Sequence, residues 1–163
     1  MSAPRVLIAC LGNIFLGDDG FGPEVARRLA GRRSPPEVTV KDFGIRSIDL
    51  TYALLEPYEL VILVDACPRG GKPGSVYLIE PEVSDNEAAA QLEGHAMNPA
   101  AVLRTVHAMG GSPAKILLVG CEPADLGGDD GKLGLSPQVE AAVEEAIATI
   151  ERALTGEKAA SCA

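Results

Sequence analysis

The sequence predicts a single α/β domain built as a three-layer sandwich, with helices on both faces of a mostly parallel, twisted sheet of five strands. Short continuous apolar runs, such as residues 6–11 and 60–64, are typical of strands that are buried on both faces. Longer segments between them carry apolar residues at helical spacing. Because strands and helices alternate along the chain, the strands are expected to run mostly parallel between two layers of helices.

The first half of the chain supplies three strands and two helices. Gly12 ends the first strand, and Pro23 opens a helix that stops near Gly31. Ser47 is expected to cap the second helix, which must end before Pro57 because proline disfavours a helical residue before it. The expected strands are residues 6–11, 38–43 and 60–64.

The second half adds two strands and two helices. Asn98 followed by Pro99, and Ser136 followed by Pro137, are typical helix starts, in which a capping side chain precedes a proline at the first helical position. The segment between the fourth strand and Asn98 is expected to be a loop with a short helix around residues 86–92. The expected strands are residues 75–79 and 115–119.

Length and composition indicate one ordinary globular domain over residues 1–163, with an ordered core of about residues 5–155 and a flexible tail at residues 156–163. No apolar run approaches the roughly 20 residues that cross a membrane, so membrane insertion is not expected. The N-terminus shows no signal-peptide pattern, which favours the cytoplasm.

Charge and cysteine spacing exclude several kinds of ligand. A net charge of −9 repels a phosphate backbone, so nucleic acid is not an expected partner. None of the four cysteines belongs to a C-x-x-C pair, which excludes a zinc knuckle and a dithiol redox motif. Cys10 and Cys121 lie in or beside apolar strands and are expected to be buried thiols.

Acidic side chains and a histidine follow the strands at the edge where doubly wound sheets bind their ligands. The first loop carries Asp18 and Asp19, Asp65 comes at the end of the third strand, and His95 follows the fourth. The first loop lacks the glycine patterns of nucleotide sites, and its aspartates would repel a phosphate. Taken alone, the two aspartates are more typical of a solvated turn, and His95 of a surface histidine.

Taken together, these groups predict a functional site. Two carboxylates and an imidazole from separate loops form a mixed oxygen and nitrogen site for a divalent metal such as nickel or zinc. The same groups also suit acid–base chemistry on a water molecule. Spacing alone does not choose between these two roles.

An ordered set of motifs resembles that of hydrogenase maturation proteases. The run from Leu11 to Gly22 is similar to the opening signature of that family, and the strand that ends in Asp65-Ala66 continues the likeness. The resemblance covers about residues 5–154. Its later motifs are His95-Ala96-Met97-Asn98-Pro99, Val119-Gly120-Cys121-Glu122-Pro123 and Gly134-Leu135-Ser136-Pro137.

The resemblance implies an aspartic-type endopeptidase that acts on the large-subunit precursor of a nickel-iron hydrogenase. Such an enzyme removes a short C-terminal extension after nickel has been inserted. The resemblance further implies that Asp19, Asp65 and His95 contact the nickel, and it leaves open whether the same three residues are catalytic. The nickel is then carried by the substrate and is not a tightly bound cofactor of the protease.

The chain departs from the family pattern in two places. The first acid is Glu in some relatives and Asp19 here, which leaves Asp18 as a competing contact. The sequence Asp42-Phe43-Gly44 stands where many relatives have Asp-Gly-Gly. The second departure is interpreted as the mark of a subgroup with its own partner hydrogenase.

Two alternative functions accompany this prediction. A non-catalytic nickel-sensing chaperone of the precursor would use the same three residues as the protease. A peptidyl-tRNA-hydrolase-like enzyme is favoured less. The likeness to that family is confined to Gly12-Asn13, lacks the catalytic histidine expected shortly afterwards, and conflicts with an acidic chain.

Overall fold

The computed structural model of the protein describes residues 4–81, 98–111, 113 and 115–156. Its sheet has the strand order β2-β1-β3-β5-β4. β1 pairs in parallel with β2 and β3, β3 pairs in parallel with β5, and β4 is antiparallel to β5. The predicted five-stranded, mostly parallel sheet is therefore confirmed. The strands are β1 (Val6–Leu11), β2 (Val38–Gly44), β3 (Leu60–Ala66), β4 (Val76–Ile79) and β5 (Ile116–Cys121).

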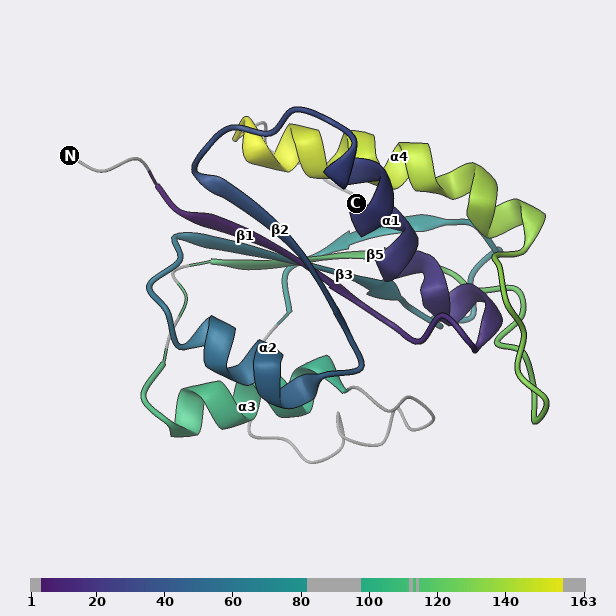
Figure 1. Cartoon of the computed structure of the whole chain (residues 1–163), viewed down its shortest axis with the longest axis horizontal. Helices are drawn as coiled ribbons and strands as arrows, with labels where there is room; N and C mark the ends of the chain where they lie inside the picture. Colours follow the sequence, from purple (N-terminus) through teal and green to yellow (C-terminus); the bar gives the residue numbers. More distant parts are fainter. Residues whose placement is uncertain (1–3, 82–97, 112, 114, 157–163) are drawn as a thin grey trace.

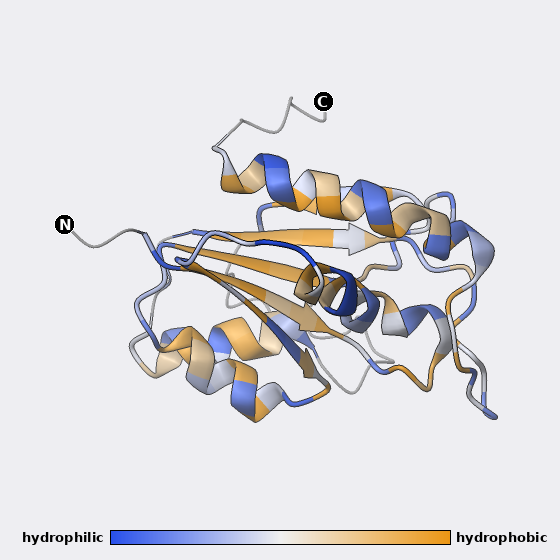
Figure 2. Cartoon of the chain, turned by 45° about the horizontal axis from the view of Figure 1, so that its top comes forward, coloured by the Kyte–Doolittle hydropathy of each residue, from blue (hydrophilic) through white to orange (hydrophobic). Residues whose placement is uncertain are grey.

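Helices cover both faces of the sheet, as predicted (Figure 1). One face carries α1 and α4, and the opposite face carries α2 and α3. In Figure 2 the strands are largely hydrophobic, whereas the helices alternate between hydrophobic and hydrophilic stretches, as expected for helices with one buried face. The helices are α1 (Phe21–Ala30), α2 (Ser47–Leu54), α3 (Pro99–Ala108) and α4 (Pro137–Leu154).

The central strand β1 contributes to two apolar cores, one on each face of the sheet. Ile8 and Cys10 point into the core beneath α1 and α4. Leu7, Ala9 and Leu11 point into the core beneath α2 and α3. This alternation explains why the run is apolar at every position, since each residue is buried on one side or the other.

Two of the three predicted helix caps are confirmed. The side chains of Asn98 and Ser136 accept hydrogen bonds from backbone N–H groups at the starts of α3 and α4. The prediction that Ser47 caps α2 is wrong, because Ser47 is already the first helical residue and no side chain caps this helix. The chain enters α2 through a tight turn in which the backbone N–H of Arg46 donates to the carbonyl oxygen of Phe43 (2.9 Å).

Strands β3 and β5 both run two residues beyond their predicted ends. Their parallel pairing continues through Asp65 with Gly120 and Ala66 with Cys121. Asp65 is therefore part of β3 and is held by sheet pairing at the strand's carboxyl end. This gives its backbone a more rigid support than a position in a loop after the strand would have given it.

The buried thiols predicted at Cys10 and Cys121 are confirmed, since both residues are fully enclosed. Burial raises the pKa of Cys10 far above its ordinary value. Burial also raises the pKa of Cys121 to about 12, and the negative charge of Asp18 adds to this effect. Both sulfurs are therefore protonated and unreactive at neutral pH.

Several sequence predictions concern segments outside the described residues. They are the short helix around residues 86–92, the residue His95 and all but the first residue of the tail at 156–163. Of the helices in the described part of the chain, none combines the length and the apolar character needed to cross a membrane.

Candidate functional site

The first loop folds back onto the carboxyl ends of β1 and β3. Gly12 follows β1 with a φ of 141°, and a Cβ at this position would overlap the carbonyl oxygen of Asp19. A Cβ at Gly22 would lie 2.7 Å from the carbonyl oxygen of Val64, which is closer than Cβ atoms approach such neighbours in protein structures. These two glycines therefore allow the loop, with its 3-10 turn η1 (Gly17–Gly20), to pack tightly against the edge of the sheet.

Asp18 is a fully buried carboxylate that joins the first loop to the segment before α4. Its Oδ2 accepts hydrogen bonds from the backbone N–H groups of Ala124 (2.8 Å) and Asp125 (2.9 Å) and from the hydroxyl of Ser136 (2.9 Å). Its Oδ1 accepts a fourth from the backbone N–H of Ser136 (2.7 Å). All four partners donate to the carboxylate, three of them to Oδ2 and one to Oδ1.

Asp19 is also buried, with 4% of its surface exposed, so the alternative interpretation of this pair as a solvated turn is wrong. Its Oδ2 accepts a hydrogen bond from the backbone N–H of Asn13 (2.9 Å), and its own N–H donates to the carbonyl oxygen of Leu16 (3.1 Å). These two bonds hold Asp19 within its own loop. The four hydrogen bonds that tie the fully buried Asp18 to distant donors make Asp18 the less suitable carboxylate to meet a ligand.

Asp65 lies at the same edge of the sheet as the first loop. Its side chain is partly buried near the end of β3, and η1 packs against that strand. The third predicted site residue, His95, lies outside the described residues. Within the described ranges, no three His, Cys, Asp or Glu side chains are grouped so as to hold a metal ion. Two members of the trio therefore share one edge, and the site as a whole stays a prediction.

Glu122 is a buried carboxylate that binds the segment after β3, and its role was not predicted from the sequence. Its carboxylate accepts hydrogen bonds from the backbone N–H groups of Arg69 (2.9 Å) and Gly71 (2.7 Å) and from the hydroxyl of Tyr77 (2.9 Å). Burial by itself would raise the pKa of Glu122, but these hydrogen bonds outweigh it and lower the pKa below its ordinary value. The sequence contains one signal for this buried carboxylate, which is the position of an acidic residue directly after an apolar strand.

The lowered pKa of Glu122 predicts a pH-dependent contribution to stability. The ionised form is favoured in the folded state, so the stabilisation is present above the ordinary pKa of 4.5 and is lost as the pH falls through the lower folded value. Glu122→Gln should lower the free energy of unfolding at pH 7 by about 1–3 kcal/mol. Urea unfolding at pH 7 and well below pH 4.5 should show the difference from the wild type shrinking in acid. An undiminished difference in acid would contradict this role.

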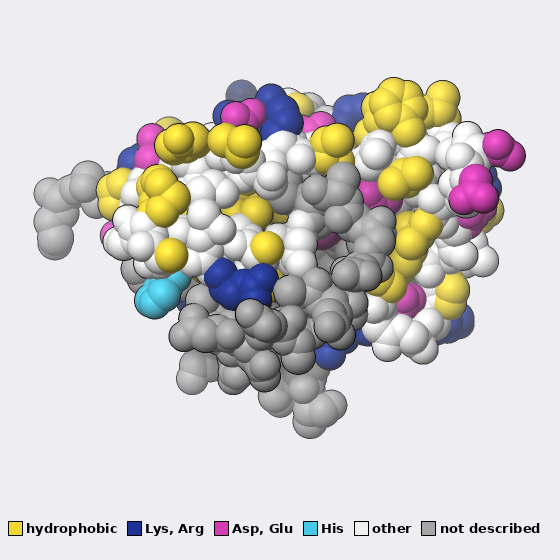
Figure 3. All heavy atoms as spheres, turned by 90° about the horizontal axis from the view of Figure 1, so that it is seen from below, with side chains coloured by type: hydrophobic (Ala, Val, Ile, Leu, Met, Phe, Trp, Pro, Cys, Tyr) yellow, Lys and Arg dark blue, Asp and Glu magenta, His cyan; other side chains and the backbone are white. Residues whose placement is uncertain are grey.

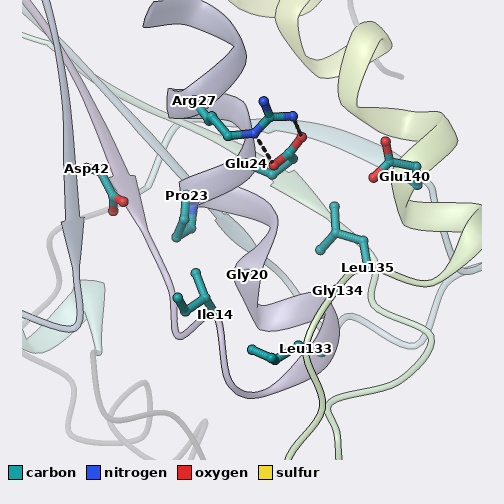
Figure 4. Close-up of a pocket in the computed structure, with 11 residues that line it drawn as sticks. Ile14, Gly20, Pro23, Glu24, Arg27, Asp42, Leu133, Gly134, Leu135 and Glu140 are labelled. Carbon is teal, nitrogen blue, oxygen red and sulfur yellow. Dashed lines mark hydrogen bonds and ion pairs between the residues drawn. The ribbon is translucent and has the colours of Figure 1, made fainter.

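A groove of about 610 Å³ opens on the outer side of the first loop, between the starts of α1 and α4 (Figure 4). Ile14, Leu133 and Leu135 supply apolar side chains to its lining. The backbone of Gly20 lines the groove as well. The groove and the carboxylate of Asp19 are therefore built by neighbouring residues of one turn.

Known proteins resemble this chain over nearly its whole length. Residues 23–153 match the sequence pattern of the family described as hydrogenase maturation protease. A protein of Methanocaldococcus jannaschii that carries this name is 31% identical over 92% of this chain and 96% of its own. The delta subunit of a coenzyme F420 hydrogenase from Methanothermobacter thermautotrophicus is 27% identical over 90% of this chain and 92% of its own.

A solved structure supports the same assignment. The hydrogenase maturating endopeptidase of Escherichia coli superposes with a TM-score of 0.79 and 28% sequence identity, covering 94% of each chain. The fold of this chain is thus one already seen in such an endopeptidase. On sequence and structure together, the chain belongs to the hydrogenase maturation protease family.

Proposed function

We propose that this protein is an endopeptidase that removes a short C-terminal extension from the nickel-loaded large-subunit precursor of a nickel-iron hydrogenase. Membership of the maturation protease family supports the reaction class. The observation that carries the proposal is the carboxylate of Asp19, which a tightly packed loop holds at the sheet edge where Asp65 is the second-last residue of β3. Two carboxylates at one edge suit both a cation and a hydrolytic water.

In this proposal, Asp19, Asp65 and His95 recognise nickel that is already seated in the precursor. Carboxylate oxygens and an imidazole nitrogen are suitable donors for a divalent ion of borderline softness. Asp18 is excluded from this role because it is fully buried and its oxygens accept four hydrogen bonds from the protein itself. The nickel is a feature of the substrate, so the protease should bind it only while the precursor is docked.

The same residues suit the hydrolytic step. A carboxylate next to a bound peptide accepts the proton of an attacking water, and the proton then passes to the amine that leaves. A substrate-borne nickel that polarises the scissile carbonyl would assist the attack. We assign the role of base to Asp19 or Asp65, because both come from rigid backbone at the sheet edge.

A non-catalytic alternative has one specific observation in its favour. A relative of 27% identity is named as a subunit of a coenzyme F420 hydrogenase and not as a protease. On this alternative, the protein docks on the nickel-bearing precursor and holds it without cutting. Docking and cleavage predict different products, so one experiment distinguishes them.

The test compares nickel-loaded and nickel-free precursor, each incubated with the purified protein and followed by gel electrophoresis. Only the nickel-loaded precursor should become shorter, since a seated ion adds ligand bonds that an empty precursor does not offer. Binding without shortening would support the non-catalytic alternative. Equal cleavage of both precursors would refute recognition through nickel. Protein purified without added metal should contain well under one equivalent of metal, as a control for substrate-borne nickel.

A further inference from the structure

Three exposed hydrophobic side chains lie on two adjacent loops, and we call them the apolar rim. Ile14 and Phe15 belong to the first loop, between β1 and α1, and Leu133 belongs to the segment between β5 and α4. Their exposed fractions are 50%, 62% and 71%. None of the three belongs to either apolar core. Folding therefore gains little from their hydrophobicity. In Figure 3, one of the groups of hydrophobic side chains lies at the right-hand end of the face, the end at which Figure 1 places these loops, and another lies toward the left-hand end.

The backbone beneath the apolar rim is ordered by hydrogen bonds between the two loops. The N–H of Lys132 donates to the carbonyl oxygen of Phe15 (2.8 Å), and the N–H of Gly17 donates to the carbonyl oxygen of Lys132 (2.8 Å). Leu16 and Lys132 form an isolated parallel bridge between the same segments. The backbone of the rim is thus already ordered, so binding a partner would cost little further backbone entropy.

The apolar rim and the candidate site share one hydrogen-bonded turn. The Oδ2 of Asp19 accepts a hydrogen bond from the N–H of Asn13 (2.9 Å), and the Oδ1 of Asn13 accepts one from the N–H of Phe15 (2.9 Å). The backbone of Ile14 packs against Gly20, where a Cβ would lie 3.3 Å from the Cα of Ile14. A macromolecule that brings a group to Asp19 therefore meets the rim residues at the same time.

The neighbouring groove extends this surface. Ile14 and Leu133 of the rim also line the groove, together with Leu135 (Figure 4). The apolar side chains thus continue from the rim into one part of the groove, while charged residues line the rest of it, namely Glu24, Arg27, Asp42 and Glu140. Exposed apolar patches of this kind mark sites of protein association, and aromatic residues such as Phe15 are enriched in them.

We propose that the apolar rim is the surface on which the large-subunit precursor docks, through an apolar patch that borders its nickel site. The inference rests on the proposed function and adds the residues that supply binding energy apart from the nickel contacts. A rim that binds the protein surface beside the metal would select the folded, nickel-loaded precursor over a free nickel ion. It would also place the scissile segment along the groove.

The test measures binding and turnover of the nickel-loaded precursor for Phe15→Ser, Leu133→Ser and the double variant. The matched controls are Tyr52→Ser and Ile48→Ser, which remove hydrophobic side chains of similar exposure, 64% and 70%, from α2. The double rim variant should raise KM and the dissociation constant at least about tenfold, as expected for central interface residues. Its kcat and thermal midpoint should stay near those of the wild type, and the controls should change neither constant.

Each outcome supports or overturns the proposal. Unchanged KM in the rim variants, with normal cleavage by the wild type, would overturn docking on the rim and leave the proposed function standing. Equal losses in the rim and control variants would also overturn it. Sedimentation should show the same oligomeric state for the wild type and the rim variants. A wild-type dimer that becomes monomeric in the rim variants would show that the rim serves self-association, and it would overturn the proposal. A wild type that neither binds nor cuts the precursor would sink the proposed function itself.

Discussion

Asp19→Asn and Asp65→Asn are expected to slow cleavage of the nickel-loaded precursor by at least about 100-fold each, because each removes an anionic ligand with little change of size. His95→Ala removes the only nitrogen ligand of the predicted trio and should have a similar effect. The measurement is the initial rate of precursor shortening on gels at fixed enzyme concentration. For Asp19, the amide oxygen of Asn still accepts the hydrogen bond from the N–H of Asn13, so this contact within the loop should be kept.

The control for this prediction is Asp129→Asn, which removes the same charge from an exposed loop position away from the strands. It should cleave at the wild-type rate, which would exclude an effect of net charge on association. Thermal unfolding should show Asp65→Asn and Asp129→Asn folded at the assay temperature. Wild-type rates in both Asp19→Asn and Asp65→Asn would remove these residues from the site.

The fold was predictable because its signals are local. Each central strand is an unbroken apolar run, and the helix starts at Asn98 and Ser136 combine a capping side chain with a proline, so a few neighbouring residues determine each element. Ser47 shows the limit of such signals. A serine in front of an amphipathic segment is a typical cap, yet the turn at Phe43 and Arg46 moves the helix start onto the serine itself.

The details of the site were less predictable because they depend on contacts between distant segments. Adjacent aspartates in a glycine-rich loop have the same local sequence environment, so the sequence could not distinguish Asp18 from Asp19. The difference comes from Ala124, Asp125 and Ser136, more than 100 residues away in the chain. The apolar rim escaped the sequence analysis for a similar reason, since an apolar residue in a loop does not by itself show whether the fold buries it.

Asp18→Asn is expected to act through stability, in contrast to Asp19→Asn. An amide has one accepting oxygen, so its NH₂ group must face at least one of the four donors that now bind the carboxylate. If the oxygen takes the position of Oδ2, the buried N–H of Ser136 loses its acceptor. The cost of leaving such a donor unsatisfied, together with the loss of charged hydrogen bonds, should be about 3 kcal/mol.

The expected measurement is a thermal midpoint lowered by about 10 °C for a domain of this size, while Asp19→Asn should shift it much less. At a temperature where Asp18→Asn is still folded, its rate of precursor cleavage should remain within about tenfold of the wild type, because the carboxylate proposed to meet nickel is still present. Ser136→Ala should reproduce part of the destabilisation, since it removes one donor to Asp18 and the cap of α4. A variant at Asp18 that keeps wild-type stability but loses cleavage would reverse the assignment and make Asp18 the contact. We thus expect the two adjacent aspartates to have separable roles, Asp18 in joining the loop to the segment before α4 and Asp19 in meeting the substrate, and this pair of substitutions tests both.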